Sequence, residues 1–331
     1  MPRTARLDAP GTLHHVMIRG IERRNIFRNK TDRLDFLQRL EKLIPETGIV
    51  CYGWAFLSNH AHFLFKTGPL PLSQFMRRLL TGYVVSFNRR HKRHGQLFQN
   101  RFKSIVCQED VYLKELIRYI HLNPVRSGLV NGLEGLDNYP YSAHRALMGK
   151  VACQWFPVAE VLTLFGKSTG SGRTAYRKFV EEGLEQGRKE ELVGGGLVRS
   201  AGGWSEVKKG QHHGMSDERI LGDSEFVNAT LSQAEESLNR HYELKAQGFD
   251  LQYIATKAAE IFQIERDKIY SPGRQSLIVS ARSLVCFWAV RELGLSLSEL
   301  ARTFQMSVPG IGYAVARGER IAKDKNLNLV I

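Results

Sequence analysis

The sequence predicts an α+β protein, in which a βαββαβ sheet domain is followed by an irregular linker and an all-α helix-turn-helix domain. Strand and helix periodicities alternate in the first third of the chain, glycine becomes frequent between residues 166 and 222, and only helical patterns follow from Leu251. A chain of 331 residues with 43% hydrophobic residues can form two cores. We expect domains over residues 1–150 and 241–331, with a connector over 151–240.

The N-terminal elements follow from hydrophobic spacing and turn residues. Alternating and β-branched segments predict strands, and apolar residues three or four apart predict helices. The expected order is strand 12–19, helix 31–44, strands 49–57 and 60–66, helix 72–90 and strand 96–107. This order matches a ferredoxin-like sheet with helices on one face.

A further helix is expected from Glu109 to just before Pro124, because proline disfavours helical conformation in the residue before it. The connector is interrupted by a short helix near residues 176–184. Helical patterns then return over residues 251–262, 276–293, 298–304 and 308–322.

Composition narrows the class of protein. No apolar run is long enough to span a membrane, and the start of the chain lacks the apolar stretch of a secretory signal, so we expect a cytoplasmic, nucleoid-associated protein with no membrane partner. The four cysteines form no C-x-x-C pair, which argues against a cysteine zinc site.

The net charge of +14 indicates a polyanionic partner, and its distribution is uneven. Residues 1–130 hold 22 of the 47 basic residues and 9 of the 33 acidic ones, a net of +13, which leaves +1 for the rest. The electrostatic binding surface is therefore expected on the N-terminal domain.

His60 and His62 are the first candidate site residues. Alternation along a strand points both imidazoles to one face, while Ala61 and Phe63 point to the other. Two neutral imidazoles side by side can hold a divalent metal. An isolated H-x-H is nevertheless more often a pair of ordinary histidines, so the motif alone decides little.

Tyr119 and Asn123 lie four residues apart on the helix that precedes Pro124, so a phenol and an amide share one helix face. Each has an ordinary alternative: Tyr119 as an aromatic packed on the sheet, and Asn123 as a helix terminator. It is their occurrence together with the histidine pair that favours a functional site.

Several stretches carry a family resemblance: FLSNHAHFL, then GQLFQNRF, then LIRYIHLNPVRSGLV and YPYSAHR. Over residues 8–148 they resemble the REP-associated tyrosine transposases, single-tyrosine transposases of the HUH type. The resemblance implies that His60, His62 and Asn123 bind Mg²⁺ or Mn²⁺. It also implies that Tyr119 is the nucleophile, and that the substrate is single-stranded or hairpin DNA.

The implied chemistry is cleavage and rejoining of DNA through a 5′-phosphotyrosine. A phenol, with a pKa near ~10, is a poor nucleophile at neutral pH and needs help at the phosphate, which a metal with open positions supplies. Tyr112 is a rival nucleophile and Glu115 a rival ligand, and neither has the Y-I-H-L-N-P context. His121, His14 and His15 are expected to be structural or to face DNA.

A basic, aromatic-interleaved surface is expected around the second helix and the strand after it, where it would hold phosphates and stack bases. Its candidate residues are Arg19, Arg77, Arg78, Arg89, Arg90, Lys92, Arg93, Arg101 and Lys103.

Residues 251–322 resemble the DNA-binding domain of the replication initiator DnaA, most clearly in SARSLVCFWAVRELGLSLSELARTFQMSV. Residues 297–304 would form the first helix of the helix-turn-helix and residues 308–317 the recognition helix, which would read duplex DNA. Candidate contacts are Arg274, Arg282, Ser307, Tyr313 and Arg317.

Two other functions remain open. A sequence-specific regulator would keep the fold without needing the tyrosine, histidines and asparagine, and a metal hydrolase would use activated water instead of Tyr119. The DNA target and the oligomeric state do not follow from the sequence.

Overall fold

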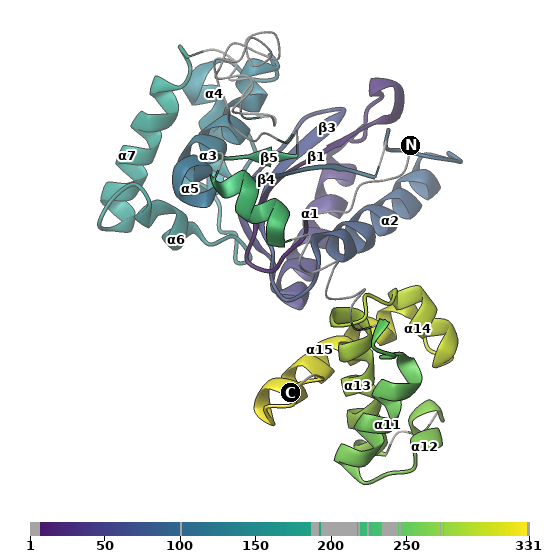
Figure 1. The fold of residues 1–331 in the computed structure, drawn as a ribbon. Helices are drawn as coiled ribbons and strands as arrows, with labels where there is room; N and C mark the ends of the chain where they lie inside the picture. The colour runs from purple at the N-terminus through teal and green to yellow at the C-terminus, as the bar shows by residue number, and fades with distance from the viewer. Residues whose placement is uncertain are drawn as a thin grey trace, which may run out of the picture. The chain divides into compact units, whose positions relative to one another are not determined.

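The computed structural model describes residues 7–99, 101–186, 192, 217, 219–223, 225–233, 244, 246–271, 273 and 275–329. The chain divides into two compact units, Met1–Leu231 and Ser232–Ile331 (Figure 1). The first unit combines a sheet with helices and the described part of the second contains helices, so the α+β class is confirmed. No helix among the described residues combines the length and apolar character needed to cross a membrane.

The sheet of the first unit has the strand order β2-β3-β1-β4-β5. β1 pairs antiparallel with β3 and β4, and β2 pairs antiparallel with β3, as a βαββαβ order requires. The short β5 runs parallel to β4 and was not expected from the sequence. The bounds are β1 Leu13–Arg19, α1 Lys30–Thr47, β2 Val50–Phe56, β3 His60–Lys66, α2 Leu72–Arg90, β4 Lys103–Cys107 and β5 Ile220–Leu221.

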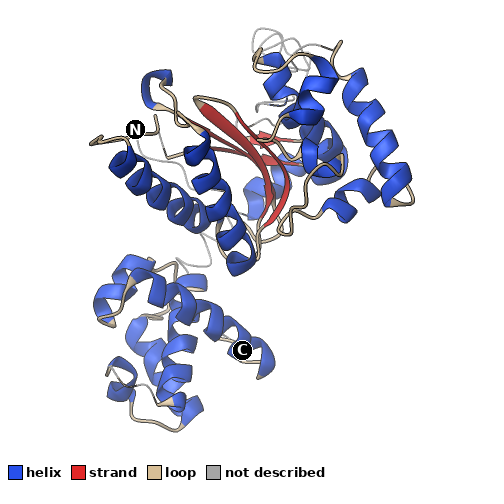
Figure 2. Cartoon of the chain, turned by 180° about the vertical axis from the view of Figure 1, so that it is seen from behind, coloured by secondary structure: helices blue, strands red, loops and turns tan. Residues whose placement is uncertain are grey.

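Helices cover both faces of the sheet (Figure 2). On one face the core is aromatic: Phe36 of α1 stacks on Phe63 of β3, and Phe75 of α2 meets Phe65 edge to face. The other face is covered by α3 (Glu109–Arg126). Because side chains alternate along β3, its phenylalanines face α1 and α2 while its histidines face α3.

Two expectations for this unit are corrected. The strand expected over 96–107 is confined to β4, because residues 96–99 run past the end of β1, held by a single bridge between Gly20 and Phe98. The helix expected to end before Pro124 continues to Arg126, with Pro124 inside it.

Residues 132–182, after α3, form α4 (Gly132–Asn138), α5 (His144–Leu147), α6 (Val158–Thr163) and α7 (Thr169–Glu182). Of these, α6 and α7 lie in the stretch expected to be a connector, where a short helix was expected near residues 176–184. The α7 helix begins at a capping box in which Ser168 and Ser171 satisfy each other's backbone N–H groups. Val161, Tyr176 and Val180 are buried in the core of the first unit, so these helices belong to it.

A buried polar network ties α3 to these helices. The Tyr176 hydroxyl lies 2.8 Å from Nδ1 of His121 on α3 and 2.7 Å from Nδ1 of His144, whose Nε2 is 2.8 Å from Asp137. Burial lowers the pKa of His121 and His144, so both imidazoles are neutral and a chain of ordinary hydrogen bonds links them. This network fixes the position of α3 on the sheet.

In the second unit, α13 lies across α15 at a glycine. A Cβ atom on Gly318 would come 2.0 Å from the Ser283 carbonyl oxygen, so only glycine permits this close approach. The helices are α11 Leu251–Phe262, α12 Arg266–Tyr270, α13 Ser276–Arg291, α14 Leu297–Thr303 and α15 Val308–Asp324. Four of them lie where the periodicity predicted helices, and α12 was not expected.

Candidate active site

The two histidines of β3 lie side by side on the face of the sheet that α3 covers. Their ring centroids are 5.2 Å apart, and His62 is buried while His60 is partly exposed. His60 Nδ1 lies 2.6 Å from Asn59 Oδ1, and His62 Nδ1 lies 3.0 Å from His15 Nε2. Both rings therefore use Nδ1 for these contacts, and Nε2 is the nitrogen that each would offer to a metal.

His15 of β1 is a third histidine at this site. It is completely buried, stacks on His62 with ring centroids 5.3 Å apart, and places Nδ1 3.2 Å from the Leu192 carbonyl oxygen. Burial lowers the pKa of His15 to about 4, so its imidazole is neutral at pH 7. Sequence analysis did not assign His15 to the site, although the period of two on β1 would have placed it on the correct face.

Tyr119 projects from α3 onto this histidine cluster. Its ring centroid lies 5.7 Å from that of His15 and 6.1 Å from that of His62, edge to face in both cases. The Arg126 guanidinium lies 5.5 Å from the centroid of the Tyr119 ring. The structure thus brings the candidate nucleophile to the histidine pair.

The Asn123 side chain compensates for the proline inside α3. Proline has no N–H to donate to the carbonyl of Ile120, four residues earlier. The Asn123 amide nitrogen donates to that carbonyl at 3.3 Å and to the Tyr119 carbonyl at 3.0 Å. Because backbone carbonyls only accept, Nδ2 must face the helix, and Oδ1 remains the atom of Asn123 that could bind a metal.

The donor set is that of a site for a hard or borderline divalent cation: two imidazole nitrogens and one amide oxygen. Among the described residues no group of three histidine, cysteine or acidic side chains is placed to hold a metal ion. Two adjacent imidazoles, each held at Nδ1 by a neighbouring side chain, fit a divalent metal. The set therefore suits Mg²⁺ or Mn²⁺ without requiring zinc.

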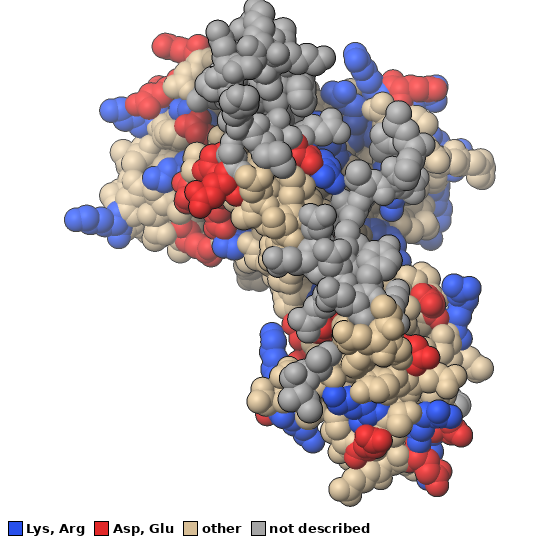
Figure 3. Space-filling view, in the orientation of Figure 1, with Lys and Arg blue, Asp and Glu red and all other residues tan. Residues whose placement is uncertain are grey.

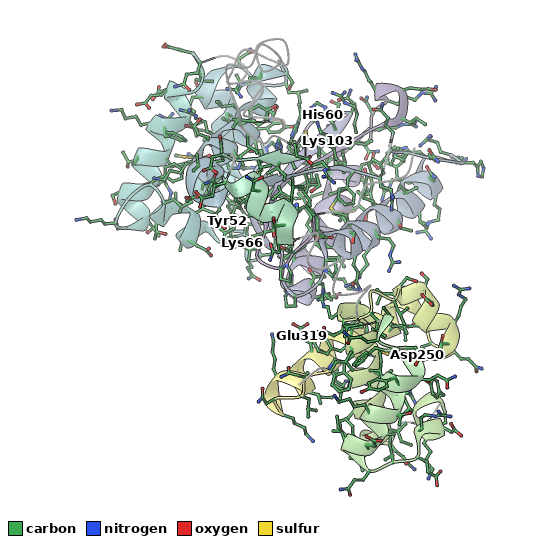
Figure 4. All side chains as sticks on the ribbon, viewed as in Figure 1. Tyr52, His60, Lys66, Lys103, Asp250 and Glu319 are labelled. Carbon is green, nitrogen blue, oxygen red and sulfur yellow. The ribbon has the colours of Figure 1, made fainter. Side chains whose placement is uncertain are left out.

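Two cations flank the histidines on the same face of the sheet. Arg19 is opposite His60 in the β1–β3 register, and Met17 is opposite both His62 and Lys103. Figure 4 shows His60 and Lys103 at one end of the sheet, and Tyr52 and Lys66 at the other. Arg19 and Lys103 are both exposed, so phosphates could reach them beside the histidines.

The other basic candidates of the first unit belong to α2, the loop after it and the segment before β4. Figure 3 shows lysines and arginines on several parts of this unit. Arg77, Arg89, Lys92 and Arg101 are exposed. Three others are engaged with neighbouring residues: Arg78 with Glu46, Arg90 with Asp32 and Asp35, and Arg93 with Asn88 and Gln96.

Of the candidate DNA contacts in the second unit, two are engaged within the fold, two are exposed and one lies outside the described residues. Arg282 is 8% exposed and donates to the carbonyls of Ile269 and Ser271 at the end of α12, so its guanidinium is engaged within the fold. The Ser307 hydroxyl caps α15 by accepting from the Gly310 N–H. Tyr313 and Arg317 are exposed on α15, and Arg274 lies outside the described residues.

Glu115, the alternative metal ligand, and Tyr112, the alternative nucleophile, also lie on α3. Glu115 forms a 2.6 Å ion pair with the buried Arg118, which also donates to the Phe179 carbonyl and lies over the Phe179 ring. Tyr112 is half-buried against the core of the first unit.

Comparison with known proteins found one family model and one solved structure that resemble part of the chain. Residues 11–123 match the family model described as IS200-like transposases, which is about a third of the chain. A solved structure of a REP-associated tyrosine transposase bound to a REP hairpin is 17% identical, with a TM-score of 0.36, over 48% of this chain and 90% of that one. No functionally curated protein matches the chain.

The role of Asn123 in α3 can be tested by a double-mutant cycle. We expect Asn123→Ala to lower the free energy of unfolding by about 1–2 kcal/mol, because the Ile120 carbonyl is left without a donor. In a Pro124→Ala background the new backbone N–H supplies that donor, so the same change should cost clearly less. Urea denaturation measures both, and equal costs in the two backgrounds would contradict the assignment.

Proposed function

We propose that this chain is a DNA transposase of the IS200-like class, which cleaves and rejoins single-stranded or hairpin DNA through a covalent link to Tyr119. The family match over residues 11–123 supports the class. The observation that carries the mechanism is the packing of the Tyr119 ring against His15 and His62, because it places one phenol beside a candidate metal site.

Tyr119 acts as the nucleophile in this proposal. Its oxygen loses its proton to water and attacks the phosphorus, and the bond to the 3′-oxygen breaks. The leaving 3′-oxygen takes up a proton from water to give a free 3′-OH, and the 5′-phosphate remains on the tyrosine. The guanidinium of Arg126 places positive charge next to the ring as the phenol loses its proton. The Tyr119 side chain is 2% exposed, so DNA binding must also open a path to its hydroxyl.

His60, His62 and Asn123 hold the cofactor, with Nε2 of each histidine and Oδ1 of Asn123 as ligands. A bound Mg²⁺ or Mn²⁺ would polarise the scissile phosphate and offset charge on its oxygens. The protein supplies the orientation: Asn59 and His15 hold the two rings, and the helix carbonyls hold the amide. Arg19 and Lys103 would bind the neighbouring phosphates.

Removal of the Tyr119 hydroxyl tests the nucleophile. We expect Tyr119→Phe to abolish the covalent adduct with a labelled single-stranded hairpin while the protein stays folded, because only one oxygen is lost. Tyr112→Phe on the same helix is the matched control and should keep full adduct formation. Denaturing gels and mass spectrometry locate the adduct, and cleavage by the Tyr119→Phe protein would favour a hydrolase that uses water.

Metal removal tests the histidine pair. Excess chelator or His60→Ala should abolish cleavage and leave most hairpin binding intact, because affinity comes mainly from basic residues. Added Mn²⁺ or Mg²⁺ should restore activity to the chelated protein but not to the variant. Cleavage that persists at full rate in chelator would rule out the metal mechanism.

Arg19 and Lys103, which are exposed beside the histidines, should matter more for DNA affinity than Arg78 of α2. We expect Arg19→Ala with Lys103→Ala to weaken single-strand binding and to reduce the salt dependence of log Kd by about 1 to 2, since up to two phosphate contacts are lost. Arg78→Ala, which removes an arginine bound to Glu46, is the control. Equal losses would show that net charge alone determines affinity.

We further propose that α14 and α15 form a helix-turn-helix that reads duplex DNA. Gln305 takes a left-handed conformation (φ 51°) in the turn, and α15 presents the exposed Tyr313 and Arg317. Replacing both by alanine in the full chain should erase site preference in a duplex selection experiment and leave hairpin cleavage unchanged. Lys323→Ala, near the end of α15, is the control, and unchanged preference in the double variant would remove this role.

A further inference from the structure

The strongest feature outside the proposed ligand set is the buried histidine of β1. His15 lies on the central strand, on the same face as His62, and touches both a proposed ligand and the proposed nucleophile through its ring. Its two ring nitrogens face two different partners, the Leu192 carbonyl and Nδ1 of His62.

We propose that His15 is a positioning residue that fixes the tautomer of His62. The Leu192 carbonyl determines the direction of the hydrogen bonds that run from His62 through His15 to Leu192. The inference rests on the metal site of the proposed function. The inference gives His15 a role beyond packing in the core.

The hydrogen-bond chain has only one consistent direction. A carbonyl oxygen can only accept, so Nδ1 of His15 carries the hydrogen that points to Leu192. A neutral imidazole has a single N–H, so Nε2 of His15 must accept. His62 Nδ1 is then the donor in the 3.0 Å contact, and Nε2 of His62 carries the lone pair that a metal ion needs.

The arrangement also fixes the orientation of the ring. The His15 and His62 planes are 27° apart, so His62 cannot rotate about its own axis without losing both the stacking and the hydrogen bond. His60 has the equivalent support from Asn59. Each proposed histidine ligand is thus oriented by one residue behind it, and the two supports differ: a side-chain amide for His60, and a relay through a backbone carbonyl for His62.

The carbonyl that accepts from His15 belongs to Leu192, which lies outside the βαββαβ elements. Its side chain is 3% exposed and is buried with the core of the first unit. In this proposal Leu192, which follows α7 in the sequence, therefore contributes to the orientation of a proposed metal ligand.

Binding of Mn²⁺ to the full-length protein, followed by the electron paramagnetic resonance signal of free Mn²⁺, tests the relay without relying on activity. We expect His15→Phe, which keeps the ring's bulk but has no acceptor, to weaken Mn²⁺ binding about 10–100-fold. His15→Gln keeps an acceptor oxygen near the position of Nε2 and should retain most of the affinity. His14→Phe is the matched control, because His14 is equally buried on the same strand but on the opposite face.

Wild-type affinity in His15→Phe, or equal losses in His15→Phe and His14→Phe, would overturn the proposal. A second measurement needs no variant: nitrogen-15 NMR of the metal-free wild-type protein should show His62 protonated at Nδ1 and His15 at Nδ1. Protonation of His62 at Nε2 would overturn the relay. If the wild-type protein binds no Mn²⁺, the metal site of the proposed function fails, and the NMR result alone decides the role of His15.

Discussion

The antiparallel pairing of β1 with β3 is the interaction on which the rest of the site depends. Its register sets Met17 opposite His62 and Arg19 opposite His60, so β1 delivers His15 and Arg19 to the face that carries the histidine pair. The alternation of the same strands sends Phe63 and Phe65 to the opposite face, where they form the aromatic core with α1 and α2. This register therefore puts the phenylalanines on one face of the sheet and the histidines on the other. A slip of one residue would exchange the two faces.

The second requirement is a helix held firmly over the polar face. A proline inside α3 would normally weaken it, but the Asn123 amide replaces the missing donor. On the other side of α3, His121 joins the Tyr176, His144 and Asp137 network, which anchors the helix to α4, α5 and α7. Asn123 thus stabilises the helix through its nitrogen while its oxygen stays available for a ligand role. The proposed mechanism needs this support, because small displacements of a nucleophile are costly.

The basic residues of the two units have different surroundings, which net charge alone does not indicate. In the first unit, exposed arginines and lysines lie beside the histidines and over α2, whereas Arg78 and Arg90 are held by acidic partners. In the second, Arg282 is used to hold α12 through carbonyl contacts, and the exposed Tyr313 and Arg317 on α15 remain as candidates for contact with DNA. Sequence position cannot distinguish these uses of arginine, since each depends on a partner distant in the chain.

The sequence by itself determined the local elements and the pairs that share a face within one element. β3 and α2 have the bounds that periodicity predicted, and the H-x-H spacing and the four-residue spacing of Tyr119 and Asn123 already placed each pair on one side. These follow from backbone geometry, which repeats every two residues in strands and every 3.6 in helices. Only the tertiary structure showed that His15 links the Leu192 carbonyl to His62, that α3 continues through Pro124, and that Arg282 is buried. Each of these depends on a hydrogen bond or contact that forms only once the whole chain has packed.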